Sequence, residues 1–440
     1  MTDYSDIPEG FEATELGVLP VDWDVVKIID VVDFTKKPRS LSINPDQILP
    51  FIPMEMIPAN NDSVSRWQEK KNSEISSGTF VFKGDLIVAK ITPCFENGKQ
   101  AILDNLPTDY AYTTTEVWPM HPKEDQISID FLSNYLRNPI IRKELTTKME
   151  GSTNRQRLPR EALQNLFIPL PHLPEQHAIA TTLRTVREAK EKTDDVIVAT
   201  KALMAAMMKH LFTYGPVSTG EAERVALKET EIGSVPEDWD ILQLGNIINE
   251  SIINGAFVKR DNFGEGVPFL NVADIYRNIR PDFNTVDKVK VLKKEIERFK
   301  LDQDDLIYVR SSLKREGIAH CCIIKAPPQD SIFDCHLMRV RVNKKIILPE
   351  YLAYFSLYDN SRRQLISLSK TTTMTTINQQ NLSNFLISIP PLPIQNRIAT
   401  ILTSIDQKLA AEQSRKEALD TLFTSLLHDL MTAKIRVSTA

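Results

Sequence analysis

One short pattern in this chain has the residue types and order of a nuclease site. Pro45–Asp46 is followed by Glu69–Lys70–Lys71, and two carboxylates with a lysine in this order bind a divalent metal in some nucleases. Nothing similar stands at the equivalent place in the second half of the chain, and such short charged patterns arise easily by chance. We therefore predict no catalytic residues, with nuclease activity as the alternative.

Other catalytic and cofactor motifs are missing from the sequence. There is no GxxxxGK[ST] phosphate loop, no GxGxxG loop, no HExxH and no [ND]PP[YF] tetrapeptide of the amino-methyltransferase type. Cys321–Cys322 with Cys335–His336 lacks the CxxC spacing of a zinc site, so we predict strand or core cysteines and no metal ligands. No cofactor is expected on the chain itself.

Polar and basic residues of the kinds that contact DNA gather in corresponding segments of the two halves. GSTNRQRLPR (151–160) and SKTTTMTTINQQN (369–381) are rich in Ser, Thr, Asn and Gln, and two hydrophobic runs end in Lys90 and Arg310. Basic and polar side chains contact phosphates, and Arg, Asn and Gln read base edges. A solvated surface loop is the alternative for these segments. The candidate DNA-binding residues are Lys90, Thr92, Ser152, Asn154, Arg155, Arg157, Arg310, Ser311, Ser312, Lys314, Arg315, Lys370, Thr372, Thr373 and Asn378.

These segments correspond because the chain contains a tandem duplication. TELGVLPVDWDV (14–25) returns as TEIGSVPEDWDI (230–241), and the longest match joins 158–183 to 377–402. The offset drifts only from 216 to 219 residues, which indicates two copies with small loop insertions. The period is far longer than the roughly 20–50 residues of a solenoid repeat, so each copy must be a domain plus an appendage.

Each copy begins with a region of mixed strand and helix. Short β-branched runs such as TFVFKGDLIVAKI (79–91) and LIYVR (306–310) predict strands, and DFLSNYLRN (130–138) predicts a short amphipathic helix. Strands do not alternate regularly with long helices, so we do not expect a doubly wound parallel sheet. The predicted fold class is α+β, with two mixed α/β domains from the duplication.

A long helix follows each proline-rich corner, IPLPHLPEQ (168–176) and IPPLPIQ (389–395). Apolar residues then recur at spacings of three, four and seven. About 36 residues give a helix of about 54 Å, longer than packing on one domain needs. We therefore expect the two helices to pack antiparallel as a coiled coil, with packing of each helix on its own domain as the alternative. The predicted seam residues are Ile179, Leu183, Val186, Leu203, Met207, Ile398, Ile405, Leu419, Leu422 and Leu426.

The bulk composition is typical of a soluble globular protein. A length of 440 residues favours two to four domains, and 42% hydrophobic with 25% charged residues is ordinary. No apolar run approaches the roughly 18 residues of a membrane helix, and the acidic start has no signal-peptide core. Four cysteines are too few for a disulfide framework, so a cytoplasmic location is expected. The net charge of −5 argues against non-specific coating of nucleic acid, whereas local basic patches suit an anionic ligand.

Two α/β domains, each followed by a corner and a long helix, resemble the specificity (S) subunit of type I restriction–modification systems. The resemblance covers essentially the whole chain and rests on the paired openings, on the LPEQHAIA and LPIQNRIA corners, and on the two long helices. The sequence departs from the family pattern in one detail, because Glu175 of the first corner corresponds to Ile394 of the second. The resemblance implies two target recognition domains, a coiled coil that sets their separation, and no active site.

The resemblance also implies partners. Family members assemble with two methyltransferase (M) subunits and with motor–nuclease (R) subunits, so S-adenosylmethionine, Mg²⁺ and ATP are expected on partner subunits. The expected ligand is double-stranded DNA with a bipartite asymmetric site, of which each recognition domain reads one half-site. A scaffold protein without sequence-specific DNA reading is a further alternative.

The repeated framework also predicts where the domains begin and end. Trp23 and Trp239 of the two openings are expected to be core anchors rather than DNA contacts. The predicted boundaries are 1–171 for the first target recognition domain, 172–214 for the first long coiled-coil helix, 215–229 for a linker, 230–389 for the second target recognition domain, and 390–440 for the second long helix and C-terminal tail.

Overall fold

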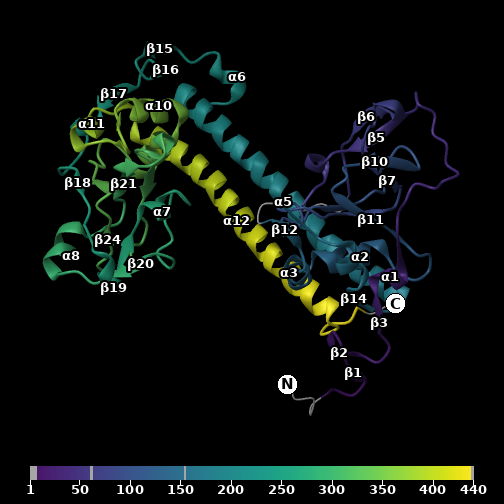
Figure 1. The fold of residues 1–440 in the computed structure, drawn as a ribbon. Helices are drawn as coiled ribbons and strands as arrows, with labels where there is room; N and C mark the ends of the chain where they lie inside the picture. The colour runs from purple at the N-terminus through teal and green to yellow at the C-terminus, as the bar shows by residue number, and fades with distance from the viewer. Residues whose placement is uncertain (1–6, 60–62, 153–154, 438–440) are drawn as a thin grey trace. The chain divides into compact units, whose positions relative to one another are not determined.

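Two compact units make up the chain in a computed structural model (Figure 1), which describes residues 7–59, 63–152 and 155–437. The first unit comprises Met1–Asp194 together with Arg415–Ala440, and the second comprises Asp195–Ser414. Each unit therefore contains one mixed α/β part and a segment of each of two long helices.

Two four-stranded sheets form the body of the first unit. One has the order β6-β5-β10-β7 with β5 parallel to β10, and the other has the order β4-β11-β8-β9 with antiparallel pairs. All four residues of β8 are buried, as the continuous apolar run LIVA requires. The strands are β1 Phe11–Thr14, β2 Gly17–Pro20, β3 Asp24–Lys27, β4 Val32–Phe34, β5 Ile48–Ile52, β6 Gln68–Lys71, β7 Thr79–Phe82, β8 Leu86–Ala89, β9 Gln100–Ile102, β10 Tyr110–Thr113, β11 Val117–Pro122, β12 Glu150–Ser152, β13 Arg155–Arg157 and β14 Phe167–Leu170. The helices are α1 Ile28–Val31, α2 Ile129–Arg137, α3 Pro139–Thr147 and α4 Arg160–Gln164.

The second unit has a related organisation with smaller sheets. A four-stranded sheet has the order β18-β25-β21-β23, and three-stranded sheets have the orders β20-β19-β24 and β22-β27-β26. Sheets with mixed strand directions, rather than a doubly wound parallel sheet, confirm the predicted class. The strands are β15 Leu227–Thr230, β16 Gly233–Pro236, β17 Asp240–Gln243, β18 Ile253–Asn254, β19 Phe263–Leu270, β20 Asp287–Val289, β21 Leu306–Val309, β22 Ser311–Ser312, β23 Cys321–Ile323, β24 Ile332–Phe333, β25 Leu337–Val340, β26 Lys370–Thr371, β27 Thr375–Thr376 and β28 Leu386–Ile389. The helices are α6 Thr219–Ala222, α7 Val272–Ile275, α8 Lys293–Phe299, α9 Pro349–Leu357, α10 Asp359–Ser367 and α11 Gln379–Ser383.

The repeated openings form the same small hairpin in each unit. The Thr14 hydroxyl donates to the Gly17 carbonyl at 2.8 Å, and the Thr230 hydroxyl donates to the Gly233 carbonyl at 2.6 Å. The φ angles of the two glycines are 107° and 102°, which only glycine adopts easily. The tryptophan that follows each hairpin is 2% or 3% exposed. The prediction that these tryptophans are core anchors is therefore confirmed.

A buried glutamine in each corner attaches the long helix to its α/β part. The Gln176 carbonyl accepts from the Ser128 amide at 2.8 Å, and its NH₂ donates to the Pro171 carbonyl at 2.8 Å. Gln395 makes the same bonds, accepting from the Leu348 amide at 2.8 Å and donating to the Pro390 carbonyl at 2.8 Å. A buried amide must be satisfied in this way, and that need explains why both corners keep glutamine.

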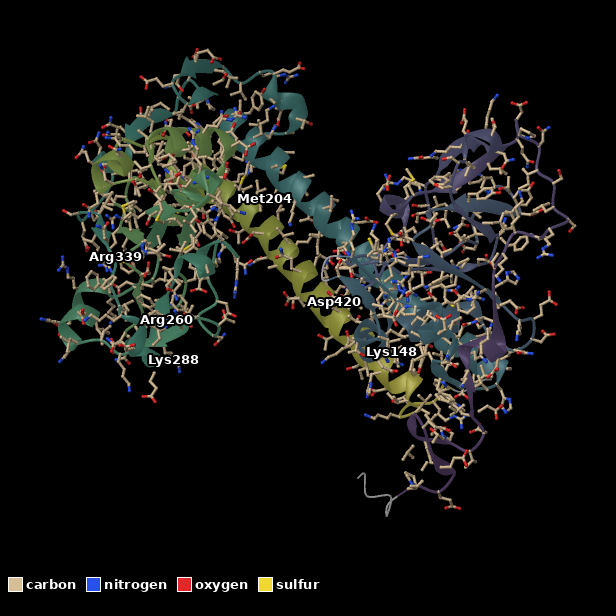
Figure 2. The ribbon with its side chains drawn as sticks, viewed as in Figure 1. Lys148, Met204, Arg260, Lys288, Arg339 and Asp420 are labelled. Carbon is tan, nitrogen blue, oxygen red and sulfur yellow. The ribbon has the colours of Figure 1, made fainter. Side chains whose placement is uncertain are left out.

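The long helices α5 Leu173–Tyr214 and α12 Leu392–Met431 pack antiparallel. In the first unit Lys190 pairs with Asp420, which is labelled on α12 in Figure 2, and Lys416 pairs with Asp194. Residue numbers therefore rise on one helix as they fall on the other. In the second unit Met204 and Met207 of α5 pack on the core that contains Ile398 and Leu402 of α12. The predicted pair of antiparallel helices is confirmed.

Two of the predicted seam residues are exposed. Ile179, Leu183 and Ile398 are buried, but Leu203 is 48% and Leu422 45% exposed, so their assignment to the seam was wrong. On α12 the neighbouring Phe423 packs on the core of the first unit instead. Adjacent residues of a helix lie about 100° apart, and at this position Phe423 is turned to the core while Leu422 points away from it. The remaining predicted residues, Val186, Met207, Ile405, Leu419 and Leu426, are partly buried.

The helix that begins at Leu173 has an apolar stretch that the sequence analysis overlooked. An 18-residue window in it has a mean hydropathy of 1.3, enough by length and composition alone to cross a membrane, and 22% of that window is buried. The core of the second unit explains part of the apolar composition of this helix, because Met204, Met207 and Met208 pack on that core. Val198 and Leu203 are exposed and have no such explanation.

Candidate nucleic-acid interface

In the first unit, two of the predicted DNA-binding segments meet at the end of β8. The Lys90 carbonyl, one residue past β8, accepts from the Leu158 amide at 2.7 Å, and the Thr92 amide donates to the Gln156 carbonyl at 3.0 Å. The β12/β13 hairpin therefore runs beside the strand end although some 65 residues separate them in sequence. Backbone pairing fixes this contact, so the hairpin's side chains can vary without loss of the arrangement.

The side chains at this place carry both signs of charge. The Arg157 guanidinium donates to Glu116 from Nε at 2.9 Å and from Nη2 at 2.7 Å. These bonds hold the pKa of Glu116 below its ordinary value. The Lys90 ammonium lies 4.2 Å from the centre of the Trp118 ring, and burial lowers its pKa. The cluster offers donors to phosphate or guanine, and one carboxylate that can accept from cytosine or adenine amino groups.

The second unit builds the same junction with other side chains. The Arg310 amide, one residue past β21, donates to the His336 carbonyl at 2.7 Å, as the Lys90 amide donates to the Glu116 carbonyl at 2.9 Å. The Ile377 amide donates to the Arg310 carbonyl at 3.0 Å, and β22 pairs with β27 of the β26/β27 hairpin. His336 therefore occupies the place of Glu116, and neither residue was among the predicted DNA-binding residues. Continuing the repeat alignment past Thr92 and Ser312 would have found them.

Most predicted DNA-binding residues lie at these two junctions. Lys90, Thr92, Arg310 and Ser311 are half-buried. The exposed ones are Ser152, Arg155, Arg157, Lys314, Arg315, Lys370, Thr372, Thr373 and Asn378, and Asn154 lies outside the described residues.

Three of these side chains already serve the fold. The buried Ser312 hydroxyl donates to the Lys314 carbonyl at 2.7 Å and accepts from its amide at 3.2 Å, closing a tight turn. The Asn378 carbonyl caps α11 by accepting from the Asn381 amide at 2.7 Å. The Thr92 hydroxyl donates to Glu96 at 2.8 Å. Serine, threonine and asparagine suit turns and caps as well as DNA contacts, so composition alone could not separate the two roles.

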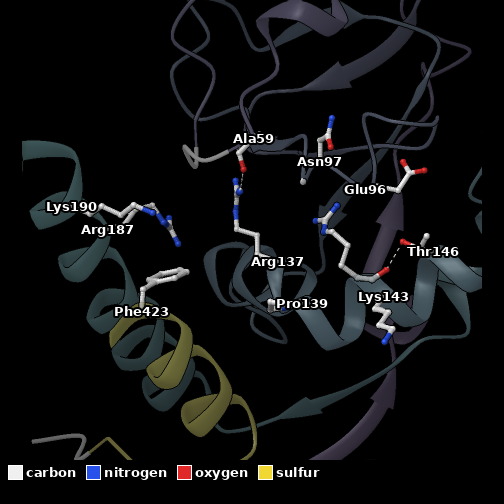
Figure 3. A pocket seen from close by; sticks show the side chains of 12 residues that line it. Ala59, Glu96, Asn97, Arg137, Pro139, Lys143, Thr146, Arg187, Lys190 and Phe423 are labelled. Carbon is white, nitrogen blue, oxygen red and sulfur yellow. Dashed lines mark hydrogen bonds between the residues drawn. The ribbon is translucent and has the colours of Figure 1, made fainter. Parts of the chain in front are cut away.

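Several basic residues that enrich these regions are structural. A pocket of about 520 Å³ in the first unit lies between α2, α3 and the long helices, and arginines line it (Figure 3). Arg137 donates to the Ala59 carbonyl at 2.7 Å, and Arg187 donates to the Asn134 side chain at 2.6 Å. Arg142 donates to backbone carbonyls, and burial lowers the pKa of Arg137 and Arg142 to about 10. Arg187 joins the long helix α5 to α2, whereas Arg137 and Arg142 hold α2 and α3 to neighbouring segments of the α/β part.

The residues suspected of metal chemistry have ordinary surroundings, with one exception. Asp46 and Lys71 form an exposed ion pair at 3.0 Å. Cys321 and Cys322 are buried strand residues, as predicted. Cys335 is only half-buried, and its thiol lies with the Asp334 carboxylate and the His336 imidazole, all within 4.8 Å of one another. Within the described ranges this is the one such cluster, and the hydrogen bond from His336 Nδ1 to Asp334 at 2.8 Å accounts for it.

Comparison with known proteins agrees with this geometry. The family model of the type I restriction modification DNA specificity domain matches residues 20–196 and 236–421, one match in each copy. The putative type I restriction enzyme MjaX specificity subunit of Methanocaldococcus jannaschii is 26% identical over 98% of both chains. The EcoAI specificity subunit of Escherichia coli is 33% identical over 39% of this chain and 29% of its own.

Solved structures show the same fold. The type I restriction–modification S subunit from M. genitalium superposes with a TM-score of 0.59 at 14% identity, covering 93% of this chain and 96% of its own. A chain from a study of complex assembly and conformational transition in the type I system superposes with a TM-score of 0.55 at 18% identity, covering 95% and 99%. With the family model matched in both copies, the chain belongs to the family of type I restriction–modification DNA specificity subunits.

Proposed function

We propose that this chain directs a type I restriction–modification complex to a bipartite asymmetric DNA site, with each α/β region reading one half-site. The observation that supports it best is the duplicated junction of strand end and hairpin. The same backbone hydrogen bonds present Lys90, Glu116 and Arg157 in one unit, and Arg310 and His336 in the other. The same backbone arrangement with different side chains suits the recognition of two different DNA sequences.

The chemistry of the complex belongs, in this proposal, to partner subunits. Two methyltransferase subunits bind S-adenosylmethionine, and motor–nuclease subunits bind ATP and Mg²⁺. This chain contributes the binding of double-stranded DNA, without catalysis, in the cytoplasm. The recognition domains are residues 1–171 and 230–389, and 215–229 is a linker. The first long helix, within 172–214, and the second, which shares 390–440 with the C-terminal tail, set the separation of the domains.

The test is to produce the chain with the methyltransferase subunit of its own system and to map the methylated adenines by single-molecule sequencing. We expect one bipartite, non-palindromic site. Replacing residues 230–389 by the matching region of a relative should change one half-site and leave the other unchanged. A replacement that alters both half-sites, or neither, contradicts the modular reading.

The alternatives give different results in the same preparation. A nuclease that uses Asp46, Glu69 and Lys71 would cut DNA without partners, in a metal-dependent way that Asp46→Ala abolishes. A scaffold would support assembly of the methyltransferase but confer no sequence preference. Either result would replace the proposed function.

A further inference from the structure

An apolar hollow lies beside the strand-end junction of the second unit. Its volume is about 680 Å³, and its walls include Tyr276, Leu313, His320 and Met374. Leu313 is 84% exposed, the largest exposed fraction among the large hydrophobic side chains of the described residues. An apolar side chain held this far into water, in a turn of otherwise polar residues, is typical of a contact surface.

The loop that carries Leu313 is held in one shape. The Ser312 hydroxyl closes the turn onto the backbone of Lys314, as described above. Arg362 donates to the carbonyls of Glu316 at 2.9 Å and Ala319 at 2.7 Å, and so fastens the other side of the loop. A fixed loop presents its apolar tip without the entropy cost of ordering it on binding.

The aromatic wall of the hollow is equally fixed. The Tyr276 hydroxyl donates to the Gly317 carbonyl at 2.9 Å, and its ring centre lies 5.2 Å from that of His320. A Cβ at Gly317 would lie 2.5 Å from the Tyr276 hydroxyl oxygen, so this approach requires glycine. Burial lowers the pKa of His320 to about 4, which leaves a neutral ring in the wall at neutral pH.

The surroundings of the hollow favour DNA as its occupant. Lys314 and Arg315 are exposed on the same loop, and Lys370 is exposed on the neighbouring hairpin. Glu316 is the single carboxylate among the lining residues, all of which lie in the fully described second unit. Cations around an apolar floor match a duplex, whose phosphates flank the grooves and whose thymine alone presents a methyl group in the major groove.

We propose that this hollow reads thymine in the second half-site through the C5-methyl group, with Leu313 and Met374 making the apolar contact. The proposal rests on the proposed function and names the chemistry of one recognition position. When the strand-end junctions of the two units are aligned by their backbone pairing, Pro93 of the first unit corresponds to Leu313. In the same alignment Arg155 corresponds to Met374. A polar base contact is therefore expected in its place in the first half-site.

The test uses the complete complex with its methyltransferase subunits and synthetic duplexes that contain the mapped site. Each thymine of the second half-site is replaced in turn by deoxyuridine, which lacks only the methyl group. We expect one replacement to weaken binding about fourfold, the effect of exposing one buried methyl group. In Leu313→Ala the same replacement should have a clearly smaller effect, because only Met374 still contacts the methyl group, and in Leu313→Ala/Met374→Ala it should have none.

Leu292→Ala is the matched control, since Leu292 is a 61% exposed leucine of the same unit that does not line the hollow. This variant should keep the full deoxyuridine effect. A second half-site without A·T pairs, or binding that no replacement changes, overturns the thymine pocket while the proposed function stands. Weakened methyltransferase assembly in Leu313→Ala, with the deoxyuridine effect intact in the complex that still forms, identifies a protein contact and also overturns it. Absence of any site-specific methylation removes both proposals.

Discussion

Arg436 donates two hydrogen bonds to the buried carboxylate of Glu175, from Nε at 3.0 Å and from Nη2 at 2.6 Å. The same guanidinium donates to Asp22 at 2.9 and 2.7 Å, and the Trp23 indole donates to Glu175 at 3.1 Å. The tail that follows α12 is thereby tied to the first opening and the first corner. Glu175 is needed only where this tail returns, and so the second corner can carry Ile394.

Removing Arg436 should destabilise the first unit. Arg436→Ala leaves the Glu175 carboxylate, whose side chain is 6% exposed, without its cation. A buried charge without a partner costs several kcal/mol, but the Arg436 side chain is 41% exposed and water can enter, so we expect a loss of about 1–3 kcal/mol. Urea unfolding measures the difference, with Lys434→Ala as a neighbouring exposed control that should change stability by less than about 0.5 kcal/mol.

The stabilisation by Arg436 should depend on pH at the acid end. The hydrogen bonds from Arg436 hold the pKa of Asp22 below its ordinary value of 3.8. A carboxyl with a lowered folded pKa stabilises the fold above its unfolded pKa, and this contribution disappears as pH falls through the folded value. The advantage of the wild type over Arg436→Ala should therefore be full above about pH 5 and shrink below it. An advantage that grows on acidification would contradict the pairing with Asp22.

The two leucines on α12 that differ in exposure make a matched pair. Leu427 is 2% exposed in the core of the first unit, whereas Leu422 is 45% exposed. Leu427→Asp should bury an unpaired charge and cost several kcal/mol, seen as a lower melting temperature and loss of helical circular dichroism. Leu422→Asp should change stability by about 0.5 kcal/mol or less. Equal effects of the two substitutions would show that the seam is placed wrongly.

Arg315 is well placed for a phosphate contact in the second unit, because it is exposed on the loop that carries Leu313. Arg315→Ala should weaken binding of the assembled complex to specific and unrelated duplexes alike. The slope of log affinity against log salt should fall by about 0.9, the value for one phosphate neutralised. Relaxed preference at a single base with an unchanged slope would instead assign Arg315 to base reading.

The architecture could be predicted because the sequence contains two copies of one unit, and the copies can be aligned with each other. The recurrence of Trp23 as Trp239 marked buried anchors, and the basic residues Lys90 and Arg310 stood at equivalent strand ends. Both pairs were found without knowledge of any contact. The segments 151–160 and 369–381 were also singled out, because their composition differs between the copies while the flanking segments agree, but they were expected to be loops, whereas they contain the hairpins β12/β13 and β26/β27.

What could not be predicted depends on contacts between distant residues or on a choice between neighbours. The pairing of Arg436 with Glu175 spans 261 residues, and no local pattern marks it. Periodicity could not decide between Leu422 and Phe423, because adjacent apolar residues leave the helix phase open to a shift of one position. Glu116 and His336 lie in no motif, and their equivalence follows from the repeat alignment when it is extended past Thr92 and Ser312 and from the backbone bonds to their carbonyls.

The division of the chain into units has a consequence for its synthesis. The second unit is one continuous segment, Asp195–Ser414, and all of its residues are synthesised before Arg415–Ala440. The first unit contains residues on both sides of that segment, so Leu183 and its neighbours have no cover from Leu427 and Leu430 until Arg415–Ala440 has been synthesised. A message cut short between the codons of Arg415 and Leu427 would therefore yield a complete second unit beside an open first core, a product whose exposed leucines mark it for proteolysis.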